Sequence, residues 1–221
     1  MLQRLLFKLS KAPFMGKMVG TVFRCCSWAV PVKKIYNNKE IIAFYHPRPS
    51  YENHIIISPK RAVRDLQQLA SEPYRIYCVK LWKAVKEIVE LHPEYEDSFV
   101  LVANGGKRQE VGQVHFHMFT NHEVVNEYSF ALLAESVFYR DSDICILEHP
   151  DPNWEKHFVI LPDLSSEIEN SYFRNVLHSI NLLDAEFHMV QKGYSFVYQY
   201  DKQKSDAEWP VFHIVSGIKL K

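Results

Sequence analysis

An internal repeat constrains the fold of this chain more than any other feature of its sequence. Residues 41–54 (IIAFYHPRPSYENH) align without gaps to residues 144–157 (ICILEHPDPNWEKH), at an offset of 103 positions, and the match continues to Pro59 and Pro162. Histidines, prolines and a glutamate are identical between the two stretches. A single repeat of this length indicates duplication of a whole domain, rather than a solenoid of short units.

Later segments of the two halves also correspond. Residues 97–100 resemble 194–197, and residues 114–117 resemble 210–213 at an offset of 96. In that alignment Val211 takes the place of His115, and no Asn-Gly-Gly sequence precedes it. The second half is therefore predicted to be a copy that has lost its chemistry. The alternative is an unrelated α+β domain with a chance His-Pro-x-Pro match.

The segment from Gln113 to Phe119 has the alternation of a half-buried strand. Successive side chains of a strand point to opposite faces, so three polar residues share one face and three apolar residues share the other. The polar set is Gln113, His115 and His117, and the apolar set is Val114, Phe116 and Met118. Imidazoles on a rigid strand suit the binding and attack of an anionic group. The alternative is a solvated strand face that carries histidines.

A glycine loop precedes this strand. Asn104-Gly105-Gly106-Lys107-Arg108 follows the apolar stretch 99–102. Glycine permits positive φ and close approach of the backbone to a ligand, and successive N–H groups in such a turn can bind phosphate oxygens. Asn-Gly is also a common hairpin turn. Joined to the histidine strand, the loop predicts a hairpin that brings backbone amides, Lys107 or Arg108, and a nucleophilic imidazole together.

From about residue 36 to residue 121 the chain resembles the histidine-triad (HIT) superfamily. The His-x-His-x-His strand of that family reads here as Gln113-Val-His115-Phe-His117, and the proline-led approach to His54 and the Asn104 and Gln109 positions also match. The resemblance implies an α+β fold, a HIT-like antiparallel sheet plus helices, in units that usually form homodimers. The fused chain is then expected to be an intramolecular pseudo-dimer, with one sheet extended across the junction, and to exist as a monomer.

The resemblance also implies roles for individual residues. His115 would attack the α-phosphorus of a nucleotide, His117 would contact the phosphate, and His54 would support both from an adjacent strand. The implied activity is that of a nucleotide hydrolase or nucleotidyl transferase, with a covalent nucleotidyl-histidine, acting on nucleoside phosphoramidates or (di)nucleoside polyphosphates. Phosphate-binding candidates surround the glycine loop: Asn104, Gly105, Gly106, Lys107 and Gln109.

Three positions depart from the family pattern. Gln113 stands in place of the first histidine, where it can hydrogen-bond but cannot carry a proton charge. His46 stands where nucleotide-binding members often have an acid for the ribose hydroxyls, and it remains a substrate-binding candidate. Ala62 replaces another frequent histidine. These departures keep a second hypothesis open, a catalytically weak nucleotide-binding or scaffold protein.

The chemistry also follows from the residues themselves. Neutral imidazole is nucleophilic near pH 7, because its reference pKa is about 6.5. Attack on phosphorus gives a phosphoramidate that water can open, without a metal or other cofactor. A His-x-His pair could instead bind zinc, but no cysteine or carboxylate ligand set lies near it. The expected partner is a nucleotide or another phosphorylated small molecule.

Composition limits the remaining options. The chain has 221 residues, of which 47% are hydrophobic, which suffices for one large or two small cores. The 26 basic and 26 acidic residues balance, so the sequence gives no sign of a nucleic-acid-binding protein. No apolar run reaches the roughly 18 residues of a transmembrane helix. The four cysteines lack the spacing of a disulfide framework or zinc site, which favours a reducing, cytoplasmic compartment.

Residues 1–34 are basic and amphipathic, with seven Lys or Arg and no acidic residue. They predict an ordinary packing helix, a peripheral contact with an anionic membrane surface, or an organelle-targeting segment. The domains expected are thus this segment at 1–34, a HIT-like catalytic domain at 35–125, and a degenerate repeat at 126–221. The expected elements are helices at about 71–93 and 169–183 and strands near 35–46, 53–59, 98–104, 111–120, 143–149, 156–162, 194–201 and 210–218.

Overall fold

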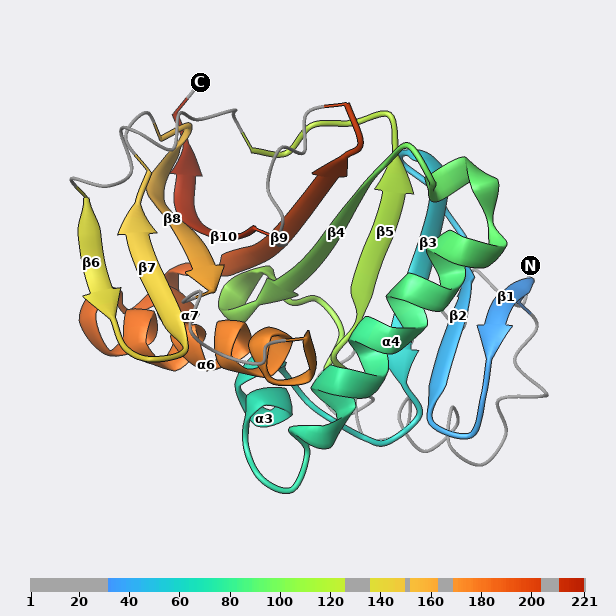
Figure 1. Cartoon of the computed structure of the whole chain (residues 1–221), viewed down its shortest axis with the longest axis horizontal. Helices are drawn as coiled ribbons and strands as arrows, with labels where there is room; N and C mark the ends of the chain where they lie inside the picture. Colours follow the sequence, from blue (N-terminus) through green and yellow to red (C-terminus); the bar gives the residue numbers. More distant parts are fainter. Residues whose placement is uncertain (1–31, 126–135, 150–151, 163–168, 204–210, 221) are drawn as a thin grey trace.

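The structure is a computed structural model that describes residues 32–125, 136–149, 152–162, 169–203 and 211–220. These residues form a ten-stranded antiparallel sheet with its helices packed on one face (Figure 1). The α+β fold with a large antiparallel sheet, predicted from the sequence, is confirmed. Residues 1–31, most of the amphipathic N-terminal segment, lie outside the described residues. The packing, membrane contact and targeting expected of this segment therefore stay predictions.

Each half of the chain supplies five strands and the helices that cover them. The first half contains β1 (Lys34–Asn37), β2 (Ile41–Tyr45), β3 (Glu52–Pro59), α3 (Leu66–Ala70), α4 (Ile76–Leu91), the 3₁₀ turn η1 (Pro93–Tyr95), β4 (Ser98–Gly105), the 3₁₀ turn η2 (Gly106–Arg108) and β5 (Phe116–Thr120). The second half contains β6 (Val137–Arg140), β7 (Ile144–Glu148), β8 (Trp154–Pro162), α6 (Glu169–Phe187), α7 (Met189–Lys192), β9 (Tyr194–Asp201) and β10 (Phe212–Lys219).

The order of strands is the same in both halves when read inward from each edge. The sheet runs β1-β2-β3-β5-β4-β9-β10-β8-β7-β6, so β4 and β9 meet at its centre (Figure 1). They pair antiparallel over their whole length, from Ser98 opposite Asp201 to Gly105 opposite Tyr194. The prediction that one sheet continues across the junction is confirmed. The domain boundaries at residues 34 and 125 stay predictions.

The main core lies between this sheet and the helices. One face of α4 is buried, since Cys78, Leu81, Val85 and Ile88 are at most 3% exposed. Phe173 of α6 stacks against Trp82 of α4, with ring centroids 5.4 Å apart. Side chains from both halves therefore share one apolar cluster, and neither half buries its own sheet alone.

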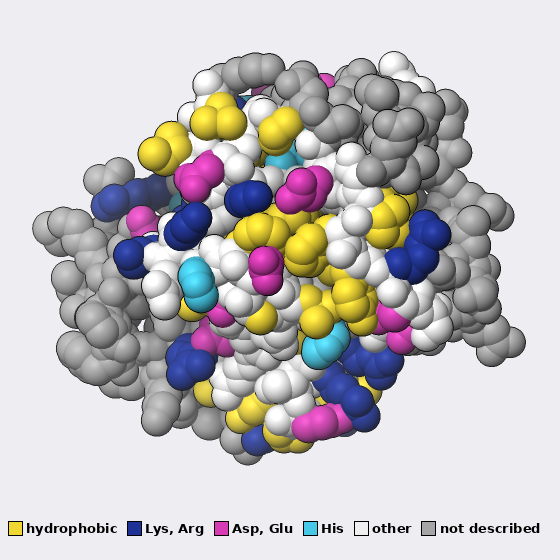
Figure 2. Space-filling model, turned by 90° about the vertical axis from the view of Figure 1, so that its left-hand side faces the viewer, with side chains coloured by type: hydrophobic (Ala, Val, Ile, Leu, Met, Phe, Trp, Pro, Cys, Tyr) yellow, Lys and Arg dark blue, Asp and Glu magenta, His cyan; other side chains and the backbone are white. Residues whose placement is uncertain are grey.

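The opposite face of the sheet carries smaller apolar clusters and the candidate site. Its central cluster joins Val100 and Phe119 of the first half to Val197 and Val215 of the second. At the β6 edge, Val137 and Phe138 are partly exposed. On that side of the molecule, apolar side chains are mixed with acidic and basic ones (Figure 2). Mixed charges beside an edge strand disfavour pairing with another chain.

Two expected strands and one expected helix differ from the observed elements. The stretch 35–46 is a hairpin rather than one strand, because Asn38 Oδ1 accepts hydrogen bonds from the amides of Glu40 and Ile41 and closes a turn. The strand expected over 111–120 starts only at Phe116. The helix expected over 71–93 covers Ile76–Leu91. None of the helices in the described residues is long and apolar enough to span a membrane.

A fragment of residues 1–125 tests the dependence of each half on the other. It would expose the hydrogen-bonding edge of β4 and the apolar residues that face α6, so we expect it to be insoluble or dimeric. Size-exclusion chromatography with light scattering measures the mass. A soluble, monomeric and fully active fragment would show that the halves are independent.

Candidate active site

His115 is held by its own backbone neighbourhood. It immediately precedes β5, and its Nδ1 lies 2.8 Å from the carbonyl oxygen of Gln113. A carbonyl can only accept, so Nδ1 carries the hydrogen and Nε2 keeps its lone pair. Burial lowers the pKa of His115, which keeps the imidazole neutral at pH 7. Its Nε2 is therefore unprotonated, as nucleophilic attack would require.

A chain of hydrogen bonds fixes the adjacent histidines. The amide of Ser50 donates to His54 Nδ1 at 3.4 Å, so His54 Nε2 carries the hydrogen and donates to His117 Nδ1 at 3.0 Å. The remaining nitrogen of His117, Nε2, must then also carry a hydrogen. The rings of His115 and His117 lie edge to face, 4.9 Å apart. The nucleophile is thus next to a neutral N–H donor.

Burial suppresses protonation throughout this group. It lowers the pKa of His54 to about 4, with a smaller effect of nearby His46. It lowers the pKa of His117 to about 2, and the neighbouring histidines add to that effect. Both imidazoles are therefore neutral donors and acceptors at physiological pH rather than cations.

His46 completes the cluster from the end of β2. Its ring stacks on His54, with centroids 4.3 Å apart and planes within 3°, and its Nδ1 accepts a hydrogen bond from the Arg48 amide at 3.1 Å. The hydrogen of neutral His46 is therefore on Nε2. The structure thus brings together four site candidates from the sequence, His46, His54, His115 and His117.

The described residues contain one group of metal-ligating geometry, His46, His54 and His117, whose ligand atoms lie within 4.8 Å of one another. A metal would need lone pairs on Nε2 of His46 and His54. Both would then have to carry hydrogen on Nδ1, facing the amide donors of Arg48 and Ser50. Since metal binding would sacrifice two backbone hydrogen bonds, the donor set fits a resident metal poorly.

Asn104 lies on β4, the strand between β5 and β9. Val102 is opposite His117 in the pairing of β4 with β5, and Asn104 lies two residues beyond Val102 on the same face of β4. His115, which precedes β5, is therefore expected near Asn104 by strand register. On its other side Asn104 is opposite Ser195 of β9, and its Oδ1 accepts the Ser195 hydroxyl at 2.8 Å.

The glycine loop contacts the second half closely. Gly106 has φ +56°, and a Cβ on it would collide with the Val190 carbonyl of α7, whereas a Cβ on Gly105 would collide with the Tyr194 ring. Lys107 is exposed. Gln109 donates its amide to the carbonyl oxygens of Arg64 and Val111, at 2.5 and 2.8 Å. The loop amides and Lys107 remain phosphate-binding candidates, whereas Gln109 braces the loop.

Gln113 occupies a different environment from the one expected. It precedes the strand and is 2% exposed. Its Nε2 donates to the carbonyl oxygens of Pro59 and Arg61, at 3.0 and 2.9 Å, and its Oε1 accepts the Val63 amide at 3.2 Å. The side chain thus holds the loop that follows β3, and its backbone carbonyl, rather than its amide, serves His115.

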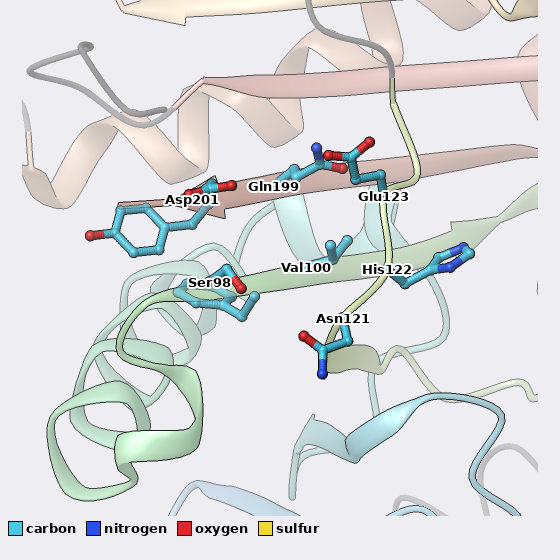
Figure 3. Close-up of a pocket in the computed structure, with 9 residues that line it drawn as sticks. Ser98, Val100, Asn121, His122, Glu123, Gln199 and Asp201 are labelled. Atoms are coloured by element: carbon cyan, nitrogen blue, oxygen red, sulfur yellow. The ribbon is translucent and has the colours of Figure 1, made fainter. Parts of the chain in front are cut away.

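Sequence reasoning did not predict a pocket on the same sheet face. It is lined by residues of β4, β9 and the segment that follows β5, as Figure 3 shows: Ser98, Phe99, Val100, Asn121, His122, Glu123, Gln199, Tyr200 and Asp201. Tyr51 lies between this pocket and the histidines, because its ring centroid is 4.7 Å from that of His122 and 5.6 Å from that of His54. Aromatic residues scattered over three elements leave no sequence pattern that would reveal such a grouping.

The second half has a matching cluster without the nucleophile. His157 Nε2 lies 3.0 Å from His213 Nδ1, and His149 stacks on His157 at 4.1 Å. Each of the three is at most 4% exposed, and Val211 precedes β10 where His115 precedes β5. The cluster repeats the His46–His54–His117 arrangement but is closed to solvent and has no attacking group.

Comparisons with known proteins agree with this geometry. Residues 29–124 match the family model of the HIT domain. An uncharacterised HIT-like protein of Helicobacter pylori is 29% identical over 91 residues, covering 40% of this chain and 84% of that protein. An uncharacterised 13.2 kDa HIT-like protein of Azospirillum brasilense is 27% identical over 92 residues, covering 41% of this chain and 75% of that protein.

Solved structures resemble the chain well beyond that domain. A DUF4931 family protein of Bacillus cereus aligns with a TM-score of 0.60 at 12% identity, covering 84% of this chain and 86% of its own. An ADP-glucose phosphorylase of Arabidopsis thaliana, solved with bound ADP-glucose, aligns with a TM-score of 0.58 at 8% identity, covering 89% and 80%. These likenesses show that the fold of both halves together occurs in other proteins.

The role of Gln113 predicts a loss of stability on substitution. In Gln113→Leu the buried Val63 amide and the carbonyl oxygens of Pro59 and Arg61 lose the hydrogen bonds that Gln113 makes to them, and an unsatisfied buried group costs roughly 1–3 kcal/mol. We expect the free energy of unfolding to fall by at least about 2 kcal/mol in urea titrations. Gln113→His can replace only part of these hydrogen bonds, so its free energy of unfolding should lie between those of the wild type and Gln113→Leu. An unchanged stability of Gln113→Leu would contradict this role.

The buried histidines predict that stability falls with acidification. Their folded pKa values lie below the unfolded value of 6.5, so the unfolded state binds more protons as pH falls from 6.5 toward the folded values of about 4 for His54 and about 2 for His157. Each can contribute a slope of up to about 1.4 kcal/mol per pH unit. His157→Gln removes one of these titrating groups but retains a donor to His213. Its free energy of unfolding should therefore fall less steeply than that of the wild type between pH 7 and 5. Equal slopes would contradict the account.

Proposed function

Residues 29–124 make this chain a member of the histidine-triad superfamily, and we propose that it is a nucleotide hydrolase or nucleotidyl transferase that acts at an α-phosphate through His115. The observation that carries the proposal is the hydrogen bond from His115 Nδ1 to the Gln113 carbonyl. It directs the Nε2 lone pair away from the backbone, beside the N–H of His117. A solvated histidine without a role would not need a defined tautomer.

In the first step His115 Nε2 attacks the phosphorus, a phosphorus–nitrogen bond forms, and the bond to the leaving group breaks with its electron pair. A phosphate leaves as an anion, whereas the nitrogen of a phosphoramidate takes a proton from solvent and leaves as an amine. The imidazole becomes positively charged, and the carbonyl oxygen of Gln113 stabilises that charge through the Nδ1 hydrogen. In the second step water attacks the phosphorus and releases the nucleotide, or an acceptor phosphate takes it over. His115 leaves as neutral imidazole in either case.

His117 acts as a hydrogen-bond donor rather than a general acid in this scheme. Its Nδ1 already accepts from His54, and its pKa of about 2 means that it holds no second proton at pH 7. Giving up the Nε2 hydrogen would leave an imidazolate, which is far too basic to form here. The N–H instead stabilises charge on a phosphoryl oxygen.

The ligand proposed is of the nucleotide type. Structural neighbours include the ADP-glucose phosphorylase with bound ADP-glucose and a uridylyltransferase, with a TM-score of 0.53 at 12% identity for the latter. At such identities they share the fold alone, so the base and leaving group do not transfer to this chain. We also propose that the second half is a degenerate repeat, since its matching cluster has Val211 before β10. We propose accordingly that the chain is a monomer with one active site, and that it is located in the cytoplasm.

The alternative is a nucleotide-binding or scaffold protein with weak catalysis. The departures at Gln113 and His46 favour it, because one is committed to bracing a loop and the other offers a donor where a ribose would need an acceptor. Turnover is the property that separates the two hypotheses.

Replacement of the nucleophile gives the direct kinetic test. His115→Asn can keep the donor to the Gln113 carbonyl while removing the attacking nitrogen, so the fold should persist and kcat should fall by about a thousandfold or more on the best of a panel of nucleoside phosphoramidates and dinucleoside polyphosphates. His213→Asn, in the matching cluster, should leave kcat nearly unchanged. If His115→Asn keeps more than about a tenth of wild-type kcat, a loss under about 1.4 kcal/mol, the mechanism is wrong.

A further inference from the structure

We propose that Ser195 in the second half is a positioning residue for Asn104, so that the active site of the first half is completed across the β4–β9 junction. The chemical consequence rests on the proposed function, whereas the geometry can be tested without any substrate. Ser195 lies opposite Asn104 in the paired strands and is 8% exposed.

The hydrogen bonds of Ser195 determine which way the carboxamide faces. Its Oγ lies 3.0 Å from Arg108 Nη1 and 2.8 Å from Asn104 Oδ1. A guanidinium only donates, so Oγ accepts from Arg108 and has its single hydrogen available for Asn104. The atom of Asn104 facing that hydrogen is therefore the oxygen, and the amide nitrogen lies on the other side of the group.

That orientation places a donor toward the nucleophile. β4 lies between β9 and β5, with Ser195 on one flank of Asn104 and His115 expected on the other by strand register. With Oδ1 fixed on the β9 side, Nδ2 is left to donate on the β5 side. A preoriented NH₂ group there stabilises negative charge on the reacting phosphate or leaving group. A carboxamide turned by 180° would instead present an oxygen to an anion.

Arg108 anchors the arrangement to the second half. The side chain comes from η2, the loop that follows Asn104, and its Nη2 donates to the Gly217 carbonyl of β10 at 2.5 Å. The guanidinium also lies over the Trp154 ring of β8, 4.6 Å from its centroid. Because contacts with two strands fix Arg108, its guanidinium always donates to Ser195 Oγ from the same side. The Ser195 hydroxyl hydrogen then points toward Asn104. A serine that only joined two strands would not need this support.

Kinetics of matched serine variants test the positioning role. Ser195→Ala should lower kcat by roughly ten- to a hundredfold, with KM and the thermal midpoint nearly unchanged, on the best substrate of the panel. Ser195→Thr retains a hydroxyl and should recover most of the loss. The control is Ser179→Ala in α6, a fully buried serine whose hydroxyl bonds only the Val176 carbonyl of its own helix. It should keep wild-type kcat.

A double-variant cycle separates positioning from general structural damage. If Ser195 acts through Asn104, then Asn104→Ala should cost about as much as Ser195→Ala, and the double variant should lose nothing further. Multiplied losses in the double variant, or a wild-type kcat in Ser195→Ala, would overturn the proposal while leaving His115 chemistry intact.

A substrate-free measurement keeps the two proposals distinguishable. The ¹⁵N-labelled side-chain NH₂ of Asn104, assigned by its absence in Asn104→Ala, should give one dispersed pair of resonances. That pair should shift toward solvent values in Ser195→Ala and stay in place in Ser179→Ala. An Asn104 signal insensitive to Ser195→Ala would overturn the positioning role, even if the enzyme is active. A sensitive signal in a chain without turnover would support the geometry and refute the proposed function.

Discussion

The antiparallel pairing of β4 with β9 is the interaction on which the rest of this structure depends. It turns two five-stranded sheets into one, removes the two edges most exposed to aggregation, and brings α4 and α6 over a common apolar core. The same register sets Ser195 beside Asn104 and brings the glycine loop against α7. The stability of the fold and the shape of the glycine loop are consequently coupled.

Much of this arrangement could be predicted from patterns of short range. Strict alternation placed Phe116 and Met118 in the core, because this prediction depends only on local periodicity and on the hydrophobic effect. The 103-residue repeat predicted the sheet across the junction, and both histidine clusters contain residues that the alignment had paired, such as His54 and His157.

Other features depend on contacts that the sequence does not display. The alternation grouped Gln113 with His115, yet the Gln113 side chain turns to the loop after β3, where it forms hydrogen bonds with three backbone groups. Ser195 is an ordinary strand serine until the register of β4 and β9 sets it beside Asn104. The tautomers of His54 and His46 follow from the amides of Ser50 and Arg48, whose positions are set by the turn between β2 and β3.

The central claim is that one residue, His115, becomes covalently bonded to phosphorus. Rapid quenching at alkaline pH during turnover of a nucleoside phosphoramidate or dinucleoside polyphosphate, followed by intact-mass and peptide analysis, measures this directly. The account predicts at most one nucleotidyl group per chain, on the peptide containing His115, labile to acid and absent from His115→Asn. An adduct on another residue, two adducts per chain, or turnover with none at any quench time would contradict it.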